Sequence, residues 1–289
     1  MKKYLVLYNP QAKKGKGQAT AEKLAELFKD AEVVFRDLTA VEDLGKLINE
    51  TPEETEIVFS GGDGTLNRVI NMMVKAGVTR KVLYYAAGTG NDFMNDLNKP
   101  ADAEPFAINE YLEGLPTVRV NDITCKFING IGFGLDGYCC EESDRLHALG
   151  KSKSYTLIAA EGLLGKYKPT NATVTVDGVT RTYERVYMAP TMFGRFFGGG
   201  VQITPHQDRK DPKHQVTNVI VHGVSRVKAL MIFLKVVAGK GDQYPQYLDY
   251  HVCDAAKVVF DRPTALQIDG ETVTNVLSYE VESVNLQKH

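Results

Sequence analysis

The chain has 289 residues, of which 43% are hydrophobic and 24% are charged, and its formal net charge is −2. This composition is typical of a globular protein with a sizeable core, and the near-neutral charge argues against a nucleic-acid partner. No apolar run reaches the roughly 18 residues of a membrane span, and the run after Met1 is too short for a signal peptide. The cysteines lack zinc-ligand spacing, so we expect reduced thiols and a cytoplasmic protein; they are Cys125, Cys139, Cys140 and Cys253.

Strand and helix patterns alternate over the first part of the chain. Apolar runs predict strands at 4–8, 32–37, 57–59 and 81–85, and apolar residues at helical spacing predict helices at 21–28, 41–48 and 66–76. This alternation predicts a parallel, doubly wound α/β sheet. In such a sheet, ligands bind at the carboxyl ends of the strands.

The strand at 57–59 runs directly into Ser60-Gly61-Gly62-Asp63-Gly64-Thr65-Leu66-Asn67. Glycines at a strand-to-helix turn expose backbone N–H groups, and these groups, with the start of the next helix, suit a phosphate. A carboxylate in that place would repel phosphate unless it holds Mg²⁺ or a water bound to Mg²⁺. The alternative is a glycine-rich turn in which Asp63 caps a helix.

Two further polar loops follow strands. Asn9-Pro10 precedes a basic glycine loop at 11–17, which lacks the final Gly-Lys-Ser/Thr of a P-loop. The strand at 81–85 leads into Gly88-Thr89-Gly90-Asn91-Asp92-Phe93. A solvated basic loop and a helix cap at Asp92 are the alternatives. The shared placement of these loops at strand ends favours a ligand site.

Strand patterns dominate beyond residue 115. We expect an α/β nucleotide-binding domain over 1–119 and a mainly β domain over 120–289, with a C-terminus that can return to the first domain. Strands are expected at 171–177, 180–189, 216–222, 247–253, 256–261 and 264–268, which predicts an antiparallel sandwich. The segment 132–137 fits G-x-G-x-x-G. Helix-like stretches at 139–149 and 154–165 follow it, so it is not expected to bind a nicotinamide cofactor.

These motifs together resemble the diacylglycerol kinase catalytic-domain family, which includes soluble bacterial lipid kinases and sphingosine kinases. NAD kinases and phosphofructokinases share the shorter GGDG core. The resemblance implies an NAD kinase- or phosphofructokinase-like first domain, a β-sandwich second domain, ATP and Mg²⁺ as cofactors, and a lipid substrate at a membrane surface. A homodimer is left open.

The resemblance also implies roles for individual residues. Asp63 would act through a Mg²⁺-bound water, and Asp92 and Asp122 would join it in a polar network. Lys13 stands where glycine is usual, so the lysine that reaches phosphate (Lys13, Lys14 or Lys16) is left open. The implied nucleotide-binding residues are Asn9, Pro10, Ala12, Lys14, Thr39, Ser60, Gly61, Gly62, Gly64, Thr65, Asn67, Gly88 and Thr89.

The second domain carries the implied catalytic base. In Leu266-Gln267-Ile268-Asp269-Gly270-Glu271, the residues alone indicate a hairpin turn followed by an exposed charge. The resemblance implies that Glu271 is the general base. The family's Asp-Gly of a second, structural Mg²⁺ site reads Asp211-Pro212 here, so that site is left open.

Two segments suggest contact with lipid. Basic residues surround apolar ones between 145 and 168, which could rest on anionic headgroups or simply pack on the core; they are Arg145, Lys151, Lys153, Lys166 and Lys168. The apolar helix pattern at 229–237 fits either burial in the sandwich or an acyl-chain pocket.

We therefore expect an ATP-dependent lipid kinase, peripheral at the membrane, that phosphorylates diacylglycerol or a related lipid alcohol in a cleft between its domains. A kinase of a soluble acceptor, like the NAD kinases, is one alternative. A non-catalytic nucleotide sensor that binds membranes is the other. An intact GGDG beside Glu271 favours an enzyme.

Overall fold

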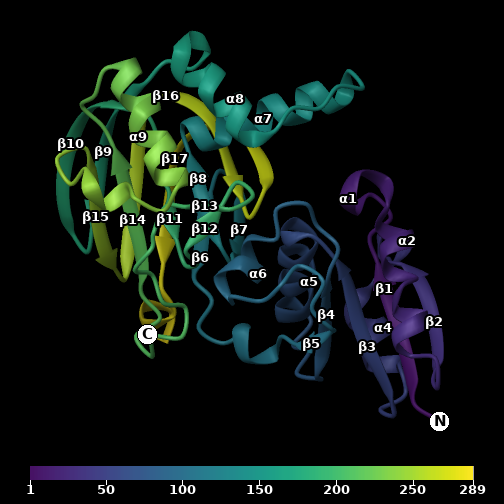
Figure 1. The fold of residues 1–289 in the computed structure, drawn as a ribbon. Coiled ribbons are helices and arrows are strands. Elements are labelled where there is room, and N and C mark those ends of the chain that lie inside the picture. Colours follow the sequence, from purple (N-terminus) through teal and green to yellow (C-terminus); the bar gives the residue numbers. More distant parts are fainter. Residues whose placement is uncertain (289) are drawn as a thin grey trace. The chain divides into compact units, whose positions relative to one another are not determined.

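The structure is a computed structural model that describes residues 1–288, and it divides into two compact units, Met1–Glu113 and Gly114–His289. The division after Glu113 lies close to the expected boundary at residue 119. Each unit has its own main sheet (Figure 1).

The first unit alternates strands with short helices. Its elements are β1 (Lys3–Tyr8), α1 (Ala12–Gly15), α2 (Gly17–Ala21), α3 (Leu24–Leu27), β2 (Glu32–Asp37), η1 (Leu38–Ala40), α4 (Leu44–Glu50), β3 (Thr55–Gly61), α5 (Asp63–Lys75), β4 (Val82–Ala86), α6 (Asp92–Asp96), β5 (Phe106–Ala107) and η2 (Asn109–Tyr111).

The first sheet has five strands in the order β2-β1-β3-β4-β5, all parallel to their neighbours except β5. Because β2 and β3 lie on opposite sides of β1, their crossovers run in opposite directions, and right-handed crossovers then place helices on both faces. On one face α4 meets the end of α5 closely: a Cβ on Gly45 would lie 2.4 Å from the Cβ of Ala76. The predicted doubly wound α/β domain is confirmed.

The expected helix at 21–28 is interrupted. It is divided into α2 and α3, and α1 before it is a turn in which Lys13 and Lys14 adopt left-handed φ angles of 51° and 59°. Residues other than glycine rarely adopt this backbone conformation, so the basic loop contains backbone strain that the sequence pattern does not reveal.

The second unit is mainly β. Its elements are β6 (Thr117–Val120), β7 (Ile123–Lys126), β8 (Gly130–Phe133), α7 (Leu135–Ala148), α8 (Tyr155–Glu161), η3 (Gly162–Lys166), β9 (Thr170–Val176), β10 (Val179–Val186), β11 (Thr191–Met192), β12 (Phe196–Phe197), β13 (Val201–Gln202), β14 (Val216–Val221), α9 (Arg226–Val237), η4 (Gly241–Gln243), β15 (Leu248–Cys253), β16 (Ala255–Ile268), β17 (Glu271–Glu282) and η5 (Val284–Lys288).

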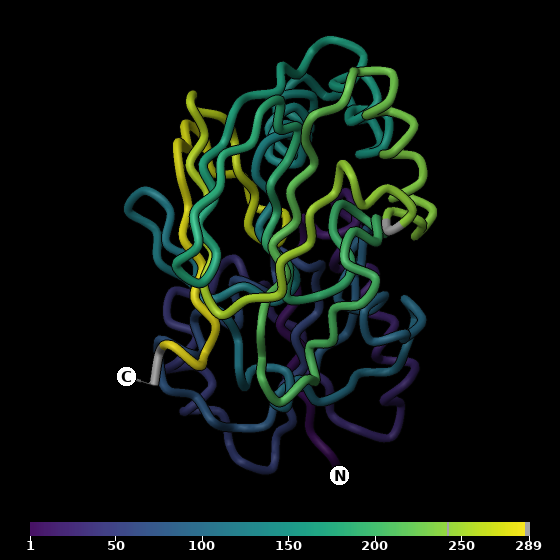
Figure 2. The backbone as a smooth tube through the Cα atoms, turned by 90° about the vertical axis from the view of Figure 1, so that its left-hand side faces the viewer, coloured from purple at the N-terminus to yellow at the C-terminus, as the bar shows by residue number. Residues whose placement is uncertain are grey.

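A ten-stranded antiparallel sheet forms this unit, and the predicted β-sandwich is confirmed. The expected strands at 256–261 and 264–268 are one strand, β16, with shifts of register between Val259 and Leu266. Its first half pairs with β9 and its end pairs with β8. In Figure 2 the yellow β16–β17 strands run beside the teal β9–β10 strands.

Aromatic rings fill the interior of the second unit. Phe133 of β8 stacks on Phe260 of β16 with ring centroids 3.9 Å apart, and Tyr279 of β17 meets Phe133 edge-on at 5.6 Å. Such pairs contribute beyond their buried area and fix how β8 lies against β16. Among residues 1–288, no helix has the length and apolar character needed to cross a membrane.

Candidate functional site

The glycine loops of the first unit meet through their backbones. They follow the neighbouring parallel strands β3 and β4, which pair with Gly61 opposite Ala86. A Cβ on Gly62 would lie 3.1 Å from Gly88 Cα, and a Cβ on Gly88 would lie 2.8 Å from Gly62 Cα. Only glycine at both positions allows this approach, so the two loops form one surface at the carboxyl end of the sheet.

Asp63 connects the same two loops. Its Oδ2 accepts the backbone N–H of Asp92 at 3.0 Å, and its Oδ1 accepts that of Phe93 at 2.9 Å. These are the first N–H groups of α6, so the carboxylate caps that helix. The structure thus places Asp63 and Asp92 together, through the backbone of Asp92. The capping alternative for Asp63 is realised.

Asn9 connects the end of β1 to the first glycine loop. Its Nδ2 donates to Thr65 Oγ1 at 2.9 Å, its Oδ1 accepts the N–H of Gln11 at 3.0 Å, and its backbone N–H donates to Ser60 O at 3.0 Å. A Cβ on Gly17 would lie 1.9 Å from the backbone oxygen of Asn9, so the chain folds tightly over this residue. The Asn-Pro start of the basic loop therefore has a structural function as well as its implied one.

The expected nucleotide-binding residues gather at one edge of the sheet. The ends of β2, β1, β3 and β4 are aligned, with Tyr8 opposite both Asp37 and Ser60. Thr39, just after β2, is exposed, and its N–H and hydroxyl both donate to Asp37 Oδ1 at 2.7 Å. Thr89, like Lys13, Lys14 and Lys16, is exposed. Their contacts with phosphate stay predictions.

Sequence reasoning missed two side chains of this edge. The Tyr84 hydroxyl donates to Gly61 O at 2.9 Å and fixes the glycine loop from within the core. Asn91 adopts a left-handed φ of 53°, and a Cβ on Gly88 would lie 2.7 Å from its Oδ1. Asparagine between a glycine and a helix start is the signal that could have shown this turn, since asparagine tolerates that conformation.

The β16–β17 hairpin of the second unit is anchored by Asp269. Its carboxylate accepts backbone N–H groups of Ile128 at 2.7 Å, Asn129 at 2.8 Å and Gly130 at 2.9 Å. Asp269 and Gly270 have φ angles of 47° and 94°, as a two-residue hairpin turn requires, so the expected turn is present. Three charge-assisted bonds to a buried carboxylate hold this turn rigidly.

Gln267 fixes the same hairpin from its other side. Its Oε1 accepts the N–H of Gly270 at 2.6 Å, and its Nε2 donates to Asp136 Oδ2 at 2.9 Å. Glu271 follows the turn and is exposed. Among the residues that the structure describes, no hydrogen bond or ion pair holds its carboxylate. The hairpin thus presents one unengaged carboxylate on a fully anchored support.

Asp136 is a buried acid at the start of α7, with 1% of its surface exposed. Burial raises its pKa to about 6, although hydrogen bonds from Tyr155 Oη and Gln267 Nε2 act in the opposite direction. A Cβ on Gly132 would lie 1.5 Å from Asp136 Oδ2, and one on Gly137 would lie 2.1 Å from Ala265 O. The glycines of the G-x-G-x-x-G segment therefore serve the packing of α7 against β8 and β16.

Arg209 is a further residue that the sequence did not indicate. Only 8% of its surface is exposed, and its guanidinium donates to Ile128 O at 3.1 Å and to Asn129 Oδ1 at 3.2 Å. It therefore supports the segment that Asp269 holds.

Close in sequence, Asp208 Oδ1 accepts the backbone N–H of Lys210, and Asp211 Oδ1 accepts that of Lys213, both at 2.9 Å. The described residues contain no group of three or more His, Cys, Asp or Glu that could hold a metal.

The remaining predicted residues have less specific surroundings. Asp122 lies in the exposed turn between β6 and β7 of the second unit, and its part in the Asp63 network stays a prediction.

The basic residues at 145–168 are largely paired. Arg145 meets Glu142 at 2.7 Å, and Lys153 and Lys166 each meet Glu161 at 2.5 Å. The two lysines lower the pKa of Glu161 to about 2, because they favour its charged form.

A small apolar cavity lies between α9 and the sheet of the second unit. Its volume is about 20 Å³, enough for one or two waters and too small for an acyl chain. It is lined by Leu135, Leu163, Tyr187, Met188, Phe197, Val201, Ile203, Val221, Ala229, Ile232, Phe233 and Val236. The expected apolar helix thus lines a small apolar cavity.

Comparison with known proteins agrees with both units. Residues 3–119 match the diacylglycerol kinase catalytic domain, and residues 129–284 match the YegS C-terminal NAD kinase β-sandwich-like domain. The chain belongs to the diacylglycerol kinase catalytic-domain family. The family resemblance of the sequence is therefore confirmed.

Individual relatives are distant. A diacylglycerol kinase of Mycobacterium tuberculosis is 23% identical over 191 residues, which are 63% of this chain and 60% of that protein. A candidate diacylglycerol kinase of Bacillus anthracis has a TM-score of 0.67 at 18% identity, over 98% of this chain and 92% of that chain. A crystal structure of a diacylglycerol kinase from the same organism gives 0.61 at 17%, over 97% and 94%. At these identities the structures show a common fold.

The raised pKa of Asp136 predicts a pH-dependent stability. Between about pH 4 and pH 6 the folded chain keeps a proton that the unfolded chain releases, so the wild type should lose stability as pH rises through this window. Asp136→Asn removes the titration. Relative to this variant, the wild-type free energy of unfolding should fall by roughly 2 kcal/mol between pH 4 and pH 7. Urea unfolding of both proteins across that range measures this.

The variant has a constant penalty as well, because an N–H₂ group replaces one of two buried acceptor oxygens and must face either the Nε2 donor of Gln267 or the hydroxyl of Tyr155. This penalty lowers the free energy of unfolding of the variant by the same amount at every pH, so it does not change how that free energy varies with pH. Parallel pH curves for the two proteins would show that Asp136 does not titrate in this window.

Proposed function

We propose that the protein is an ATP-dependent kinase that transfers the γ-phosphoryl group to the hydroxyl of diacylglycerol or a related lipid alcohol. The observation that carries this proposal is Glu271, an exposed and unengaged carboxylate on a hairpin fixed by Gln267 and Asp269. A general base requires a free carboxylate in a fixed position. The family membership and the anion-suited glycine loops support the same activity.

In this mechanism, the first unit holds the nucleotide. Backbone N–H groups of the loops at Gly61, Gly62 and Gly88 would bind phosphate oxygens, together with Thr89. Mg²⁺ usually keeps several waters and binds one or two carboxylates plus phosphates. Asp63 suits that arrangement by its charge and by its place between the two glycine loops, where its carboxylate is fixed by backbone N–H groups of Asp92 and Phe93. When bound, Mg²⁺ neutralises charge on the phosphates.

The second unit supplies the acceptor chemistry. Glu271 takes the proton of the acceptor hydroxyl while the hydroxyl oxygen bonds to the γ-phosphorus of ATP. The bond between the γ-phosphorus and the β–γ bridging oxygen breaks, and ADP leaves. The family membership supports an acceptor with acyl chains, and the cavity beneath α9 has an apolar lining that such a chain could contact. Because the cavity is too small as it stands, a chain would enter by displacing side chains of α9 or its neighbours.

The direct test uses the purified protein with labelled ATP and Mg²⁺. It compares a panel of lipid alcohols with soluble hydroxyl acceptors that include NAD. We expect phosphorylation of a diacylglycerol or another lipid alcohol. Phosphorylation of NAD alone would identify the protein as a kinase of a soluble acceptor. Nucleotide binding with no phosphorylated product from any acceptor would favour the non-catalytic sensor.

Substitution of Glu271 tests its role as base. Glu271→Gln keeps size and polarity, and the turn does not depend on this side chain, so stability should change by no more than about 0.5 kcal/mol. Turnover with lipid should fall by roughly 10²–10⁴, the usual effect of losing acid–base catalysis, while ATP affinity is kept. Glu280→Gln on the same strand is the matched control, because Glu280 pairs with Lys257 at 2.7 Å and should not affect turnover. Equal turnover in the parent and both variants would show that Glu271 is not the general base.

Asp63→Asn should affect both stability and rate. The amide accepts only one of the two backbone N–H groups of α6, which should cost about 1–2 kcal/mol. Loss of the charge near the phosphates should reduce turnover roughly a thousandfold. The control is Asp43→Ala, which removes the cap at Lys46 of α4 for about 1 kcal/mol and should keep turnover. Thermal unfolding and turnover, measured on each protein, separate the effects. A destabilised Asp63→Asn variant with normal turnover would reduce Asp63 to a helix cap.

A further inference from the structure

Helix α9 has apolar residues on both of its sides. Its inner side chains, Ala229, Ile232, Phe233 and Val236, are buried and line the cavity. On the opposite side, Val227, Met231 and Leu234 are 67%, 53% and 54% exposed. Their spacing of four and three residues aligns them in one stripe, which we call the outer stripe of α9. Exposed Ala238 continues it just beyond the helix.

Such a stripe differs from ordinary surface hydrophobics. Isolated exposed apolar residues are common, and a helix on the surface of a globular protein normally turns its polar side to water. Here three exposed large side chains of α9 are apolar and adjacent. A helix that is apolar all round is normally covered on both sides, so the outer stripe indicates an apolar environment that covers it in use.

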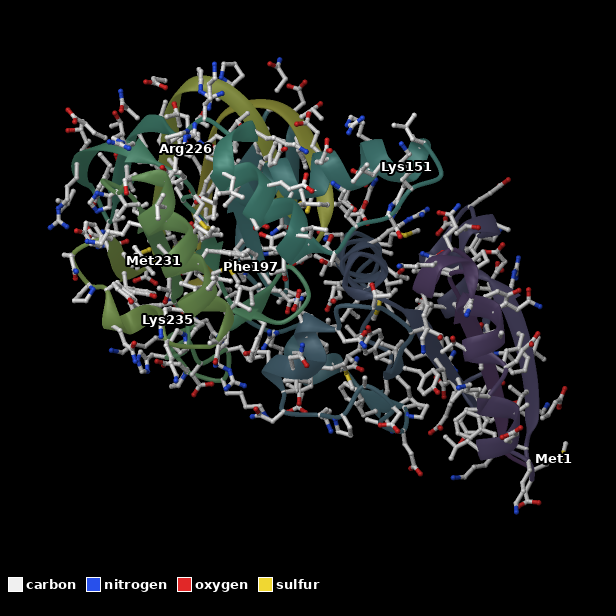
Figure 3. All side chains as sticks on the ribbon, turned by 45° about the horizontal axis from the view of Figure 1, so that its top comes forward. Met1, Lys151, Phe197, Arg226, Met231 and Lys235 are labelled. Atoms are coloured by element: carbon white, nitrogen blue, oxygen red, sulfur yellow. The ribbon has the colours of Figure 1, made fainter. Side chains whose placement is uncertain are left out.

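The charges of α9 are all positive. Arg226, Lys228 and Lys235 lie on the helix, and residues 226–237 include no Asp or Glu. Figure 3 shows Arg226, Met231 and Lys235 in succession along α9. Lys235 and Lys240 are exposed, and within the described side chains neither has a carboxylate partner.

The other two cations of the helix are held by neutral groups. Lys228 Nζ lies 4.2 Å from the ring centroid of Tyr247 and donates to its hydroxyl at 2.5 Å. Arg226 donates to the backbone oxygens of Leu163 at 3.3 Å and Tyr167 at 2.8 Å. Their charge is therefore retained, whereas Lys153 and Lys166 of the α8 region share an ion pair with Glu161.

We propose that the outer stripe of α9 docks the protein on an anionic lipid bilayer. Apolar side chains bordered by cations are the features that place a helix at the headgroup boundary of such a bilayer. Three side chains are far too few for a stable protein interface, which needs about 800 Å² from each partner, whereas a bilayer requires no complementary surface. The inference rests on the proposed function, since a kinase of a lipid alcohol must reach its acceptor at a bilayer surface.

The test is sedimentation of the full chain with vesicles, without ATP or acceptor. Vesicles of phosphatidylcholine alone are compared with vesicles that also contain phosphatidylserine, at low and high salt. The parent should bind the anionic vesicles more tightly, and salt should weaken this binding by screening exposed charge. Met231→Gln with Leu234→Gln should weaken binding roughly tenfold or more, because two apolar side chains no longer enter the interface. Lys235→Gln should weaken binding to anionic vesicles only.

The matched control is Val179→Gln with Val252→Gln, at positions that are 59% and 65% exposed on β10 and β15. This control should bind like the parent. The α9 double variant should still phosphorylate a dispersed short-chain acceptor, so a failure of docking is distinguishable from a failure of the kinase. Equal vesicle binding by parent and α9 variant would overturn the proposal. So would a parent that self-associates in solution through the stripe, shown by a smaller particle size for the α9 variant.

Discussion

Carboxylates that accept backbone N–H groups hold the functional loops of both units. Asp63 joins the loop after β3 to the start of α6, and Asp269 joins the β16–β17 turn to residues 128–130. A carboxylate has lone pairs for several donors, and bonds to a charged acceptor are stronger than neutral ones. Each acid therefore fixes two segments that are distant in sequence. The glycine N–H groups and Glu271 lie beside these acids. They are held in place by the bonds that the acids make, so their own polar atoms are not needed to fix the loops.

This arrangement explains why the loops could be located from sequence and their internal contacts could not. Apolar strands followed by glycine predict where a ligand edge lies, and β1 to β4 follow that pattern. The partner of Asp63 lies 29 residues away and the first partner of Asp269 lies 141 residues away. A motif has the same letters whether its acid contacts a metal-bound water, a helix end or both. Only the fold determines which donors reach it.

Other departures from prediction have local causes. The left-handed φ angles of Lys13 and Lys14, and the division of the expected helix at 21–28 after Ala21, are not visible in the apolar pattern, because periodicity reports side-chain faces and not φ angles. Pro263 lies where β16 shifts register, and the pattern there indicated two strands. In a strand, proline removes a donor without ending the chain's extension, so the strand continues past it. Likewise, Gly132 and Gly137 satisfy a dinucleotide pattern because α7 packs closely on the sheet.

Helix α9 shows what a one-dimensional pattern leaves undetermined. Its apolar residues surround the helix axis, so periodicity alone could not separate a buried side from an exposed one. The sheet and η3 cover the inner side and leave the outer stripe bare. Burial of the inner side attaches α9 to the sandwich, and the cavity beside these residues has a volume of only about 20 Å³. The helix therefore has one apolar side that the protein covers and one that it leaves to its surroundings. The two sides can be told apart only when the fold shows what covers each of them, and this is why the outer stripe could not be found from the sequence.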